Sequence, residues 1–353
     1  MKILITGTEG YLGSLLAPIL IQQGHELLAV DTGYYRTGWL YHGSLVSPET
    51  LNKDIRHITA ADLDGAKAVV HMAELSNDPT GELAPQITYQ INHQGSVRLA
   101  GLAKQAGVKR FVYMSSCSVY GFASEEHVTE ESPVNPQTAY AICKTLVERD
   151  LKAMADDNFS PTFLRNATAY GASPRMRFDI VLNNLAGLAW TTKEIKMISD
   201  GTPWRPLVHA LDIAQAIVAA LDAPRDAVHN QIFNVGESAH NYTVKEIAQV
   251  VADAFPGCRL SFGQKSSDHR SYRVSFDKIK GRLPGFKCRW DARRGAEQLR
   301  ALFQQVDLTP DAFNGRAFTR LKQLEYLIRT HQIDGDFFWR DAQSPELKSG
   351  PAK

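Results

Sequence analysis

The chain has 353 residues, of which 44% are hydrophobic and 22% charged, a composition typical of a globular protein. This length allows one large domain or two smaller ones. Its formal net charge of +1 argues against a nucleic-acid partner, which would require a strongly basic surface. No apolar run approaches the roughly 18 residues of a membrane span, and no signal peptide precedes the first predicted strand, so we expect no membrane association.

Four cysteines, Cys117, Cys143, Cys258 and Cys288, are spread along the chain. Their spacing matches neither a metal-ligand set nor a disulfide framework. We therefore predict no metal site and a cytoplasmic location.

The N-terminus predicts a strand, a glycine turn and the start of a helix, in that order. The apolar run Lys2–Thr6 is followed by glycines spaced Gly-x-x-Gly-x-x-Gly, and helical periodicity begins directly after them. This is the context of a dinucleotide-binding turn, in which glycines allow a pyrophosphate to approach a helix N-terminus. The cofactor-binding residues predicted here are Gly7, Gly10, Tyr11, Leu12 and Gly13.

A second predicted strand, residues 25–30, is followed at once by Asp31. A carboxylate at this position accepts hydrogen bonds from the adenosine ribose hydroxyls and repels a 2′-phosphate. The sequence therefore favours NAD over NADP.

Strands and helices alternate over the next hundred residues. Asp54 and Ile55 lie in a third short segment, and a fourth strand spans residues 67–73. Helical periodicity continues to Lys104, and a fifth strand, residues 108–114, leads into Ser116. This alternation predicts a parallel, doubly wound sheet of the Rossmann type, whose strands bring Gly7, Asp31, Ala73 and Ser116 to one carboxyl edge.

Tyr140 and Lys144 are four residues apart, so on a helix they lie on one face. A phenol with an unperturbed pKa near ~10 is a poor base at neutral pH, and a neighbouring ammonium favours its phenolate. Ser116 would add a hydroxyl that holds a substrate oxygen against the phenol. We predict Ser116, Tyr140 and Lys144 as catalytic residues.

Together, the glycine turn, Asp31, the segment His71-Met-Ala73, Ser116 and the Tyr140/Lys144 pair resemble the extended short-chain dehydrogenases/reductases. Within them, the chain is similar to the nucleotide-sugar epimerase/dehydratase group from Met1 to about Lys280. The resemblance implies that Tyr140 is the acid/base and that Lys144 orients the nicotinamide ribose. It also implies adenine contacts from Asp54 and Ile55, and places Ala73 and Asn92 near the cofactor.

By the same resemblance, the second half of the chain binds the sugar nucleotide. Arginine suits a diphosphate because its planar fork makes bidentate charged hydrogen bonds. Arg175, Arg177 and Arg273 are weaker candidates, for which simple solvation is equally expected. The predicted substrate-binding residues are Ser116, Asn166, Asn184, Arg205, Lys265 and Arg270.

We expect residues 1–170 to form the NAD-binding domain, with residues 205–236 returning to it. Residues 171–204 and 237–335 would form a smaller mixed α/β lobe for the substrate, with a tail at 336–353. An apolar stripe at Leu321, Leu324 and Leu327 is expected to pack against that lobe. A homodimer is expected through the helices near residues 83–105 and 137–155.

Among the group's reactions, sugar 4,6-dehydration is disfavoured, because the Asp-Glu pair that follows the catalytic residue there is replaced by Cys117 and Ser118. A 3,5-epimerase cysteine would stand at Ser118, so that reaction is disfavoured too. NAD-dependent 4-epimerisation of a nucleotide-diphosphate sugar is the leading hypothesis. The alternatives are a nucleotide-keto-sugar reductase and a non-catalytic NAD sensor. Glu74, close to the expected nicotinamide, is an unusual feature without an assigned role.

Overall fold

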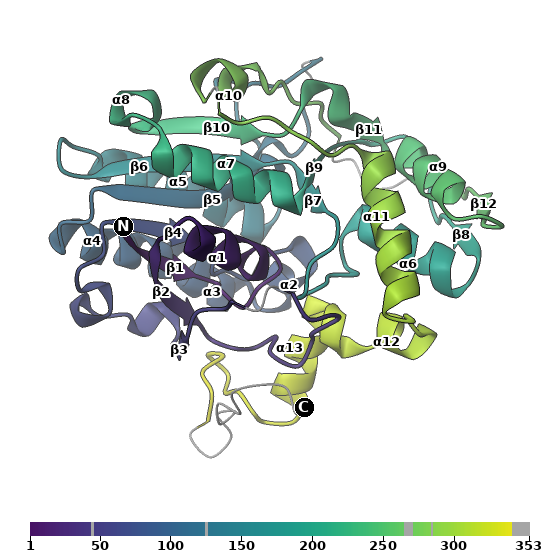
Figure 1. Ribbon diagram of the computed structural model, residues 1–353, viewed down its shortest axis with the longest axis horizontal. Coiled ribbons are helices and arrows are strands. Elements are labelled where there is room, and N and C mark those ends of the chain that lie inside the picture. Colours follow the sequence, from purple (N-terminus) through teal and green to yellow (C-terminus); the bar gives the residue numbers. More distant parts are fainter. Residues whose placement is uncertain (44–45, 124–125, 265–270, 284, 341–353) are drawn as a thin grey trace.

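The computed structural model describes residues 1–43, 46–123, 126–264, 271–283 and 285–340, and its centre is one large parallel sheet (Figure 1). All seven strands pair in parallel, so their carboxyl ends share one edge. The predicted doubly wound α/β fold is therefore confirmed. In spatial order, the strands are β3 (Thr50–Asn52), β2 (Glu26–Asp31), β1 (Lys2–Thr6), β4 (Ala68–His71), β5 (Arg110–Ser116), β6 (Ser160–Asn166) and β10 (Gln231–Val235).

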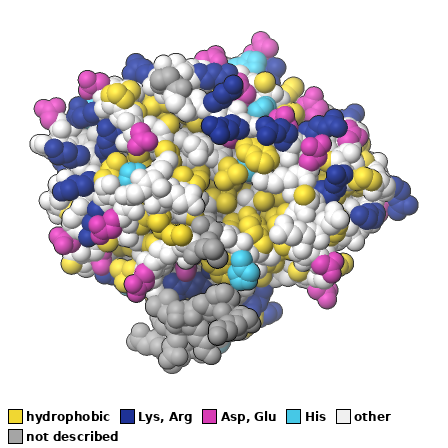
Figure 2. Space-filling view, viewed as in Figure 1, with side chains coloured by type: hydrophobic (Ala, Val, Ile, Leu, Met, Phe, Trp, Pro, Cys, Tyr) yellow, Lys and Arg dark blue, Asp and Glu magenta, His cyan; other side chains and the backbone are white. Residues whose placement is uncertain are grey.

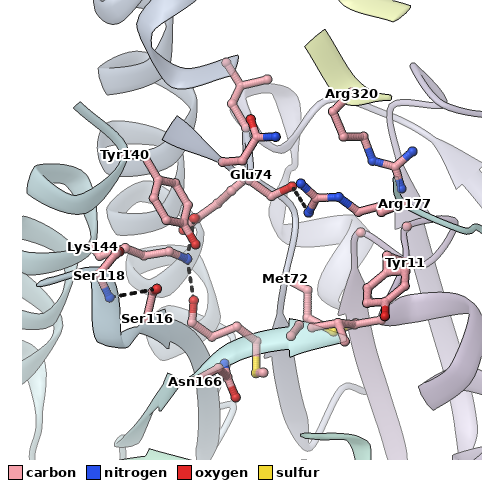
Figure 3. A pocket seen from close by; sticks show the side chains of 18 of the residues that line it. Tyr11, Met72, Glu74, Ser116, Ser118, Tyr140, Lys144, Asn166, Arg177 and Arg320 are labelled. Atoms are coloured by element: carbon pink, nitrogen blue, oxygen red, sulfur yellow. Dashed lines mark hydrogen bonds and ion pairs between the residues drawn. The ribbon is translucent and has the colours of Figure 1, made fainter. Parts of the chain in front are cut away.

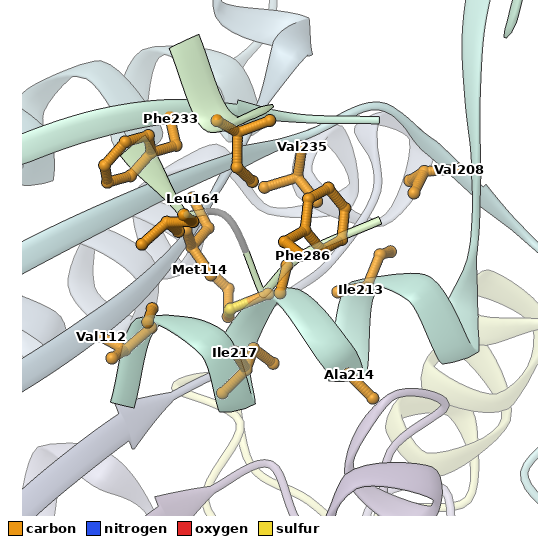
Figure 4. Packing of buried hydrophobic residues seen from close by; sticks show 14 of the residues in the cluster. Val112, Met114, Leu164, Val208, Ile213, Ala214, Ile217, Phe233, Val235 and Phe286 are labelled. Carbon is orange, nitrogen blue, oxygen red and sulfur yellow. The ribbon is translucent and has the colours of Figure 1, made fainter. Parts of the chain in front are cut away.

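Alternating side chains of these strands enter two hydrophobic cores, one on each face of the sheet. Ile3 and Ile5 belong to the first core, whereas Leu4 between them belongs to the second. This alternation follows from the two-residue period of a strand. Figure 4 shows the first core, in which Ile213 and Ile217 face Val112 of the sheet.

Helices cover both faces of the sheet, as a parallel sheet requires. The first core is covered by α1 (Gly13–Gln22), α7 (Ala210–Asp222) and α10 (Asp277–Arg282). The second is covered by α3 (Pro85–Thr88), the π-helix η3 (Tyr89–Gly95), α4 (Ser96–Gln105) and α5 (Ala139–Met154). Short helices in the connections are η1 (Ile55–His57), η2 (Ala60–Leu63), α2 (Asp78–Leu83), η4 (Cys117–Tyr120) and α8 (Arg225–Val228).

A third hydrophobic core lies beside the sheet, at the right of Figure 1. Two small sheets accompany it: β11-β9-β7, made of β7 (Thr168–Tyr170), β9 (Trp204–His209) and β11 (Asn241–Thr243), and β12-β8, made of β8 (Glu194–Lys196) and β12 (Arg259–Ser261). Its helices are α6 (Val181–Thr191), η5 (Ser238–His240), α9 (Val244–Ala254), α11 (Ala292–Gln305), α12 (Pro310–Asn314) and η6 (Arg316–Phe318). Residues 205–236 were expected to return to the domain of the large sheet. Of this stretch, β10 joins the large sheet and α7 covers it, whereas β9 pairs within the three-stranded sheet.

The C-terminal helix α13 (Arg320–Arg329) lies on the side of the sheet edge formed by β2 and β3, not on the second lobe (Figure 1). Leu324 and Leu327 join the second core together with Val30 and Ile55. The expectation that this stripe packs against the substrate lobe was therefore wrong.

The predicted tail begins as packed structure. Phe337 is buried, its carbonyl accepts a hydrogen bond from the Tyr34 hydroxyl, and Trp339 Nε1 donates to Thr32 O over 2.6 Å. Residues 341–353 of the predicted tail lie outside the described residues.

Acidic and basic side chains are interspersed on the face seen in Figure 2, in keeping with the net charge of +1. Within the described ranges, no helix has the length and apolar content needed to cross a bilayer.

Replacing Leu324 with alanine should lower the free energy of unfolding by about 2–5 kcal/mol, because the side chain is fully buried in the second core. Leu321→Ala, on the same helix but partly exposed, should cost clearly less. Denaturant unfolding of both variants measures the difference. If both variants lost the same free energy of unfolding, the packing of Leu324 in the second core would not be supported.

Candidate active site

A cavity lies at the carboxyl edge of the large sheet and is lined by residues of the glycine turn. Figure 3 shows side chains that surround it, among them Tyr11, Tyr140 and Arg177. Gly7 has a φ of +76°, which favours glycine. A Cβ on Gly13 would stand 2.2 Å from the Gly7 carbonyl oxygen, and one on Gly7 would stand 2.9 Å from Ala73 N. The turn is thus compact because only glycines fit it, which leaves its backbone close to the cavity. All five residues predicted for this turn line the cavity: Gly7, Gly10, Tyr11, Leu12 and Gly13.

Asp31 is fixed at the end of β2 by two backbone donors. Glu9 N lies 3.0 Å from Oδ2, and Gly33 N lies 2.8 Å from Oδ1. Burial and the neighbouring Glu9 raise the pKa of its carboxyl, while the two N–H groups oppose that rise. Asp54 and Ile55 line the same end of the cavity, so all three predicted adenosine-side residues are brought together.

The three predicted catalytic side chains meet at the other end of the cavity (Figure 3). Ser116 ends β5, and Tyr140 and Lys144 face the cavity from the first turns of α5, whose N-cap is Thr138. The ammonium of Lys144 lies 5.2 Å from the centroid of the Tyr140 ring. The Ser116 hydroxyl accepts a hydrogen bond from Ser118 N over 3.1 Å. The arrangement brings a phenol, an ammonium and a hydroxyl to one point.

The protonation of Tyr140 differs from the expectation. Burial is the largest influence and raises the pKa of the phenol; Lys144 and Ser116 lower it, and the carboxylates of Glu74 and Asp78 raise it further. The net direction is upward, so Tyr140 is a neutral phenol in this state of the site. The expectation that Lys144 alone brings the pKa down overlooked burial and the two carboxylates.

Glu74 points into the site and does not extend into solvent. Its carboxylate forms an ion pair with Lys144, and Oε1 accepts a hydrogen bond from the Tyr113 hydroxyl over 2.7 Å. The side chain is only 3% exposed and lines the cavity. The sequence signal for this residue was its position directly after the predicted strand 67–73, close to the expected nicotinamide.

On the far side of Ser116, polar groups face the space expected for a substrate. Ser118 Oγ and Asn166 Oδ1 are buried, line the cavity and have no hydrogen-bond partner in the described structure. Asn166 is held by donating Nδ2 to the carbonyl oxygens of Ser115 and Leu164, each over 3.1 Å. Arg205 enters the cavity from β9, with Nη1 donating to Trp204 O over 2.8 Å. Such groups can bind hydroxyls and an anion.

Two predicted site residues lie elsewhere. Asn92 is fully buried behind the cavity, where its amide bonds Leu75 N over 2.9 Å and Leu75 O over 3.0 Å and so fixes the loop after β4. Asn184 donates Nδ2 to Phe178 O over 2.9 Å and does not line the cavity. Neither residue therefore lines the cavity as expected, for the same reason: each side-chain amide hydrogen-bonds the backbone of a neighbouring loop. Lys265 and Arg270 lie outside the described residues.

A further group of charged residues lines the cavity, and the sequence analysis named only Arg177 among them, as a weaker candidate. Arg177 Nε binds Asp179 Oδ1 over 2.8 Å, and Asp179 Oδ2 accepts from Asn77 Nδ2 and from the backbone N of Arg320. Arg320, the first residue of α13, is 3% exposed and lies 4.1 Å over the Tyr35 ring. Burial, and then Arg177, lower the pKa of Arg320 to about 10, so it stays charged at neutral pH. Nothing in the sequence places a residue so distant at this cavity.

The cavity fits an extended dinucleotide. The glycine turn leaves room for a pyrophosphate, Asp31 holds acceptor oxygens for a ribose, and Lys144 offers a cation at the catalytic end. Among the described residues, no group of three or more His, Cys, Asp or Glu side chains could hold a metal ion.

Fold and site thus define a dinucleotide-binding enzyme of the short-chain dehydrogenase type. The NAD dependent epimerase/dehydratase family matches residues 3–236. The chain belongs to this family, as predicted, and its cofactor is NAD.

Known proteins similar to this chain include epimerases and dehydratases. The chain is 26% identical to UDP-glucose 4-epimerase of Bacillus subtilis over 338 residues, which cover 85% of this chain and 94% of the relative. It resembles the structure of MoeE5 in complex with UDP-glucuronic acid and NAD, with 25% identity and a TM-score of 0.73 over 86% of this chain and 99% of that one. DesIV, a dTDP-glucose 4,6-dehydratase from Streptomyces venezuelae, has the same fold at 21% identity and a TM-score of 0.73, over 86% of this chain and 97% of that one.

Asp31 should make the chain bind NAD at least ~10-fold more tightly than NADP, because a 2′-phosphate beside a carboxylate costs more than ~1.4 kcal/mol. Titration of both cofactors by calorimetry measures the ratio. The Asp31→Asn variant should show a smaller preference for NAD over NADP. Equal affinities in the unmodified protein would refute the role of Asp31.

Proposed function

We propose that this chain is an NAD-dependent epimerase that inverts C4 of a nucleotide-diphosphate sugar through a transient ketone. The observation that supports this most is the meeting of Ser116, Tyr140 and Lys144 at one end of a cavity that also contains the glycine turn. The polar atoms of Ser118 and Asn166 and the guanidinium of Arg205 provide the adjoining substrate side.

In this proposal, the neutral phenol of Tyr140 first loses its proton, and the phenolate then accepts the proton of the C4 hydroxyl while Ser116 holds that oxygen. NAD, when bound beside Tyr140 and Lys144, would supply both the acceptor and the donor of the hydride. Lys144 stabilises the phenolate form and orients the nicotinamide ribose. Tyr140 then gives the proton back, so a single acid/base serves both half-reactions.

The surroundings of Cys117 disfavour dehydration. Its thiol is 1% exposed, and Sγ donates to Arg165 O over 3.2 Å. Burial raises the pKa of the thiol far above neutrality, so it cannot act as the base of an elimination. Ser118 lines the cavity, but a hydroxyl is not an acid at neutral pH.

Reduction of a nucleotide keto-sugar is the second candidate, and the raised pKa of Tyr140 favours it. Ketone reduction begins with proton donation, for which a neutral phenol is ready. The two functions differ in cofactor demand. An epimerase interconverts sugars without added NADH, whereas a reductase consumes NADH in proportion to product; steady-state assays with and without NADH separate them.

We also propose a homodimer formed through α4 and α5; Val97 and Leu102 of α4 pack against the second core and are only partly buried. A monomeric mass by light scattering at micromolar concentration would contradict it.

The described cysteines are unpaired, which suits the reducing cytoplasm that we propose as the location.

Tyr140→Phe should fold and retain NAD, but lose turnover by ~100-fold or more, because only the proton-transferring hydroxyl is removed. Retained activity above ~10% would place the acid/base elsewhere. If even the unmodified protein turns over no sugar nucleotide while it binds NAD, the non-catalytic sensor becomes the better explanation.

Arg205→Ala should raise the KM for a sugar nucleotide by about one to two orders of magnitude, because a lost charged hydrogen bond costs ~1.5–3 kcal/mol. The affinity for NAD should not change. Arg273→Ala is the matched control, since Arg273 lies 5.0 Å over the neighbouring Trp204 ring without lining the cavity. A parallel loss of NAD in Arg205→Ala would mark Arg205 as structural.

A further inference from the structure

The carboxylate of Glu74 belongs to the catalytic end of the cavity, and the proposed reaction leaves it unused. Glu74 lies three residues after the end of β4, and its carboxylate lies between the Tyr113 hydroxyl at 2.7 Å and the ammonium of Lys144. Side-chain exposure is 3% for Glu74 and 5% for Lys144. Burial raises the pKa of this carboxyl, whereas the charge of Lys144 and the hydrogen bonds from Lys144 and Tyr113 oppose that rise. A buried carboxylate is costly unless it is paired, and the ion pair with Lys144 offsets that cost.

The partners of Lys144 show how the charge is used. An ammonium has three N–H donors. One reaches the Met114 carbonyl oxygen and another side of the ammonium faces Glu74. Lys144 is therefore held from two sides and charge-balanced before any ligand arrives. This differs from a site in which lysine is the sole charge beside the tyrosine.

We infer that Glu74 is a positioning residue that balances the positive charge of Lys144, so that the site binds the oxidised, cationic nicotinamide in preference to the reduced, neutral one. The inference rests on the proposed function in one respect: the nicotinamide lies beside Tyr140 and Lys144. Without Glu74, two cations would meet in a buried site; with it, the oxidised ring enters beside a neutral pair.

No other described group that faces Glu74 supplies this charge at neutral pH. Tyr113 and Tyr140 are neutral phenols because burial raises the pKa of both. Burial, and then Lys144, lower the pKa of His71 to about 3, so it is neutral as well. Burial also keeps the Cys143 thiol protonated, with a pKa raised to about 12.

This preference deepens the proposed function. An epimerase begins each cycle with hydride removal and so needs its cofactor oxidised between turnovers. A site that favours NAD⁺ over NADH supplies that condition, whereas a reductase would gain nothing from it.

The experiment equilibrates the full-length protein with mixtures of NAD⁺ and NADH and measures the bound ratio after rapid gel filtration. Glu74→Gln should shift this ratio about tenfold toward NADH, because a unit charge is lost close to the ring. Glu74→Asp should keep the ratio of the unmodified protein. Tyr113→Phe is the matched control, since it removes the hydrogen bond to Glu74 but keeps the charge.

Two further variants keep the inference testable if Glu74→Gln fails to fold around an unpaired lysine. Lys144→Met alone should shift the ratio toward NAD⁺, and the double variant Glu74→Gln/Lys144→Met should return it close to that of the unmodified protein. An unchanged ratio in Glu74→Gln, or an equal shift in Tyr113→Phe, would overturn the inference. Equal weakening of both cofactors would mark Glu74 as merely structural. No sugar is needed, so the outcome is independent of whether turnover proves to be epimerisation.

Discussion

The close approach of the glycine turn to the end of β4 is the constraint on which the site depends. A side chain at Gly13 would collide with the Gly7 carbonyl oxygen, and one at Gly7 with the backbone of Ala73. Thr6 Oγ1 strengthens this junction by accepting hydrogen bonds from Met72 N and Ala73 N, each over 3.2 Å. The turn that faces the pyrophosphate and the loop that carries Glu74 are thereby fixed relative to each other. Cofactor and catalytic groups meet because two adjacent strands end at this junction.

Charges in the cavity are arranged mainly as pairs. Lys144 faces Glu74 at the catalytic end, and Arg177 faces Asp179 on the opposite wall. Pairing offsets the desolvation of each charge, and a partner that is removed leaves the other buried and uncompensated. The pairs also decide how the cavity meets its ligands, because a balanced pair presents little net charge. Tyr140 is accordingly governed by burial and by the whole set of neighbouring charges, and not by Lys144 alone.

The C-terminal segment completes the cofactor end of the cavity. Gln323 Nε2 donates to Tyr34 O over 2.9 Å, and Phe338 stacks on His57 with ring centroids 4.5 Å apart. These contacts support the loop after β2 and the helix η1, which flank Asp31 and Asp54. Arg320, from the same segment, reaches the cavity itself. Residues beyond the family match at 3–236 therefore contribute to the same site.

The sequence by itself determined the features that depend on neighbours in the chain: the strand–turn–helix around Gly7 to Gly13, the carboxylate at Asp31, and the helical spacing of Tyr140 and Lys144. Each is a local pattern with one structural solution, and the parallel order of strands brings them to one edge. The tertiary structure alone decided where Glu74 points, that Asn92 and Asn184 hold backbone rather than ligand, and that Arg320 enters the cavity. These outcomes depend on contacts between segments up to about three hundred residues apart. The type of a side chain and its spacing in the sequence indicate what it can bind. Only the tertiary structure determines which of those possible partners lies within contact distance.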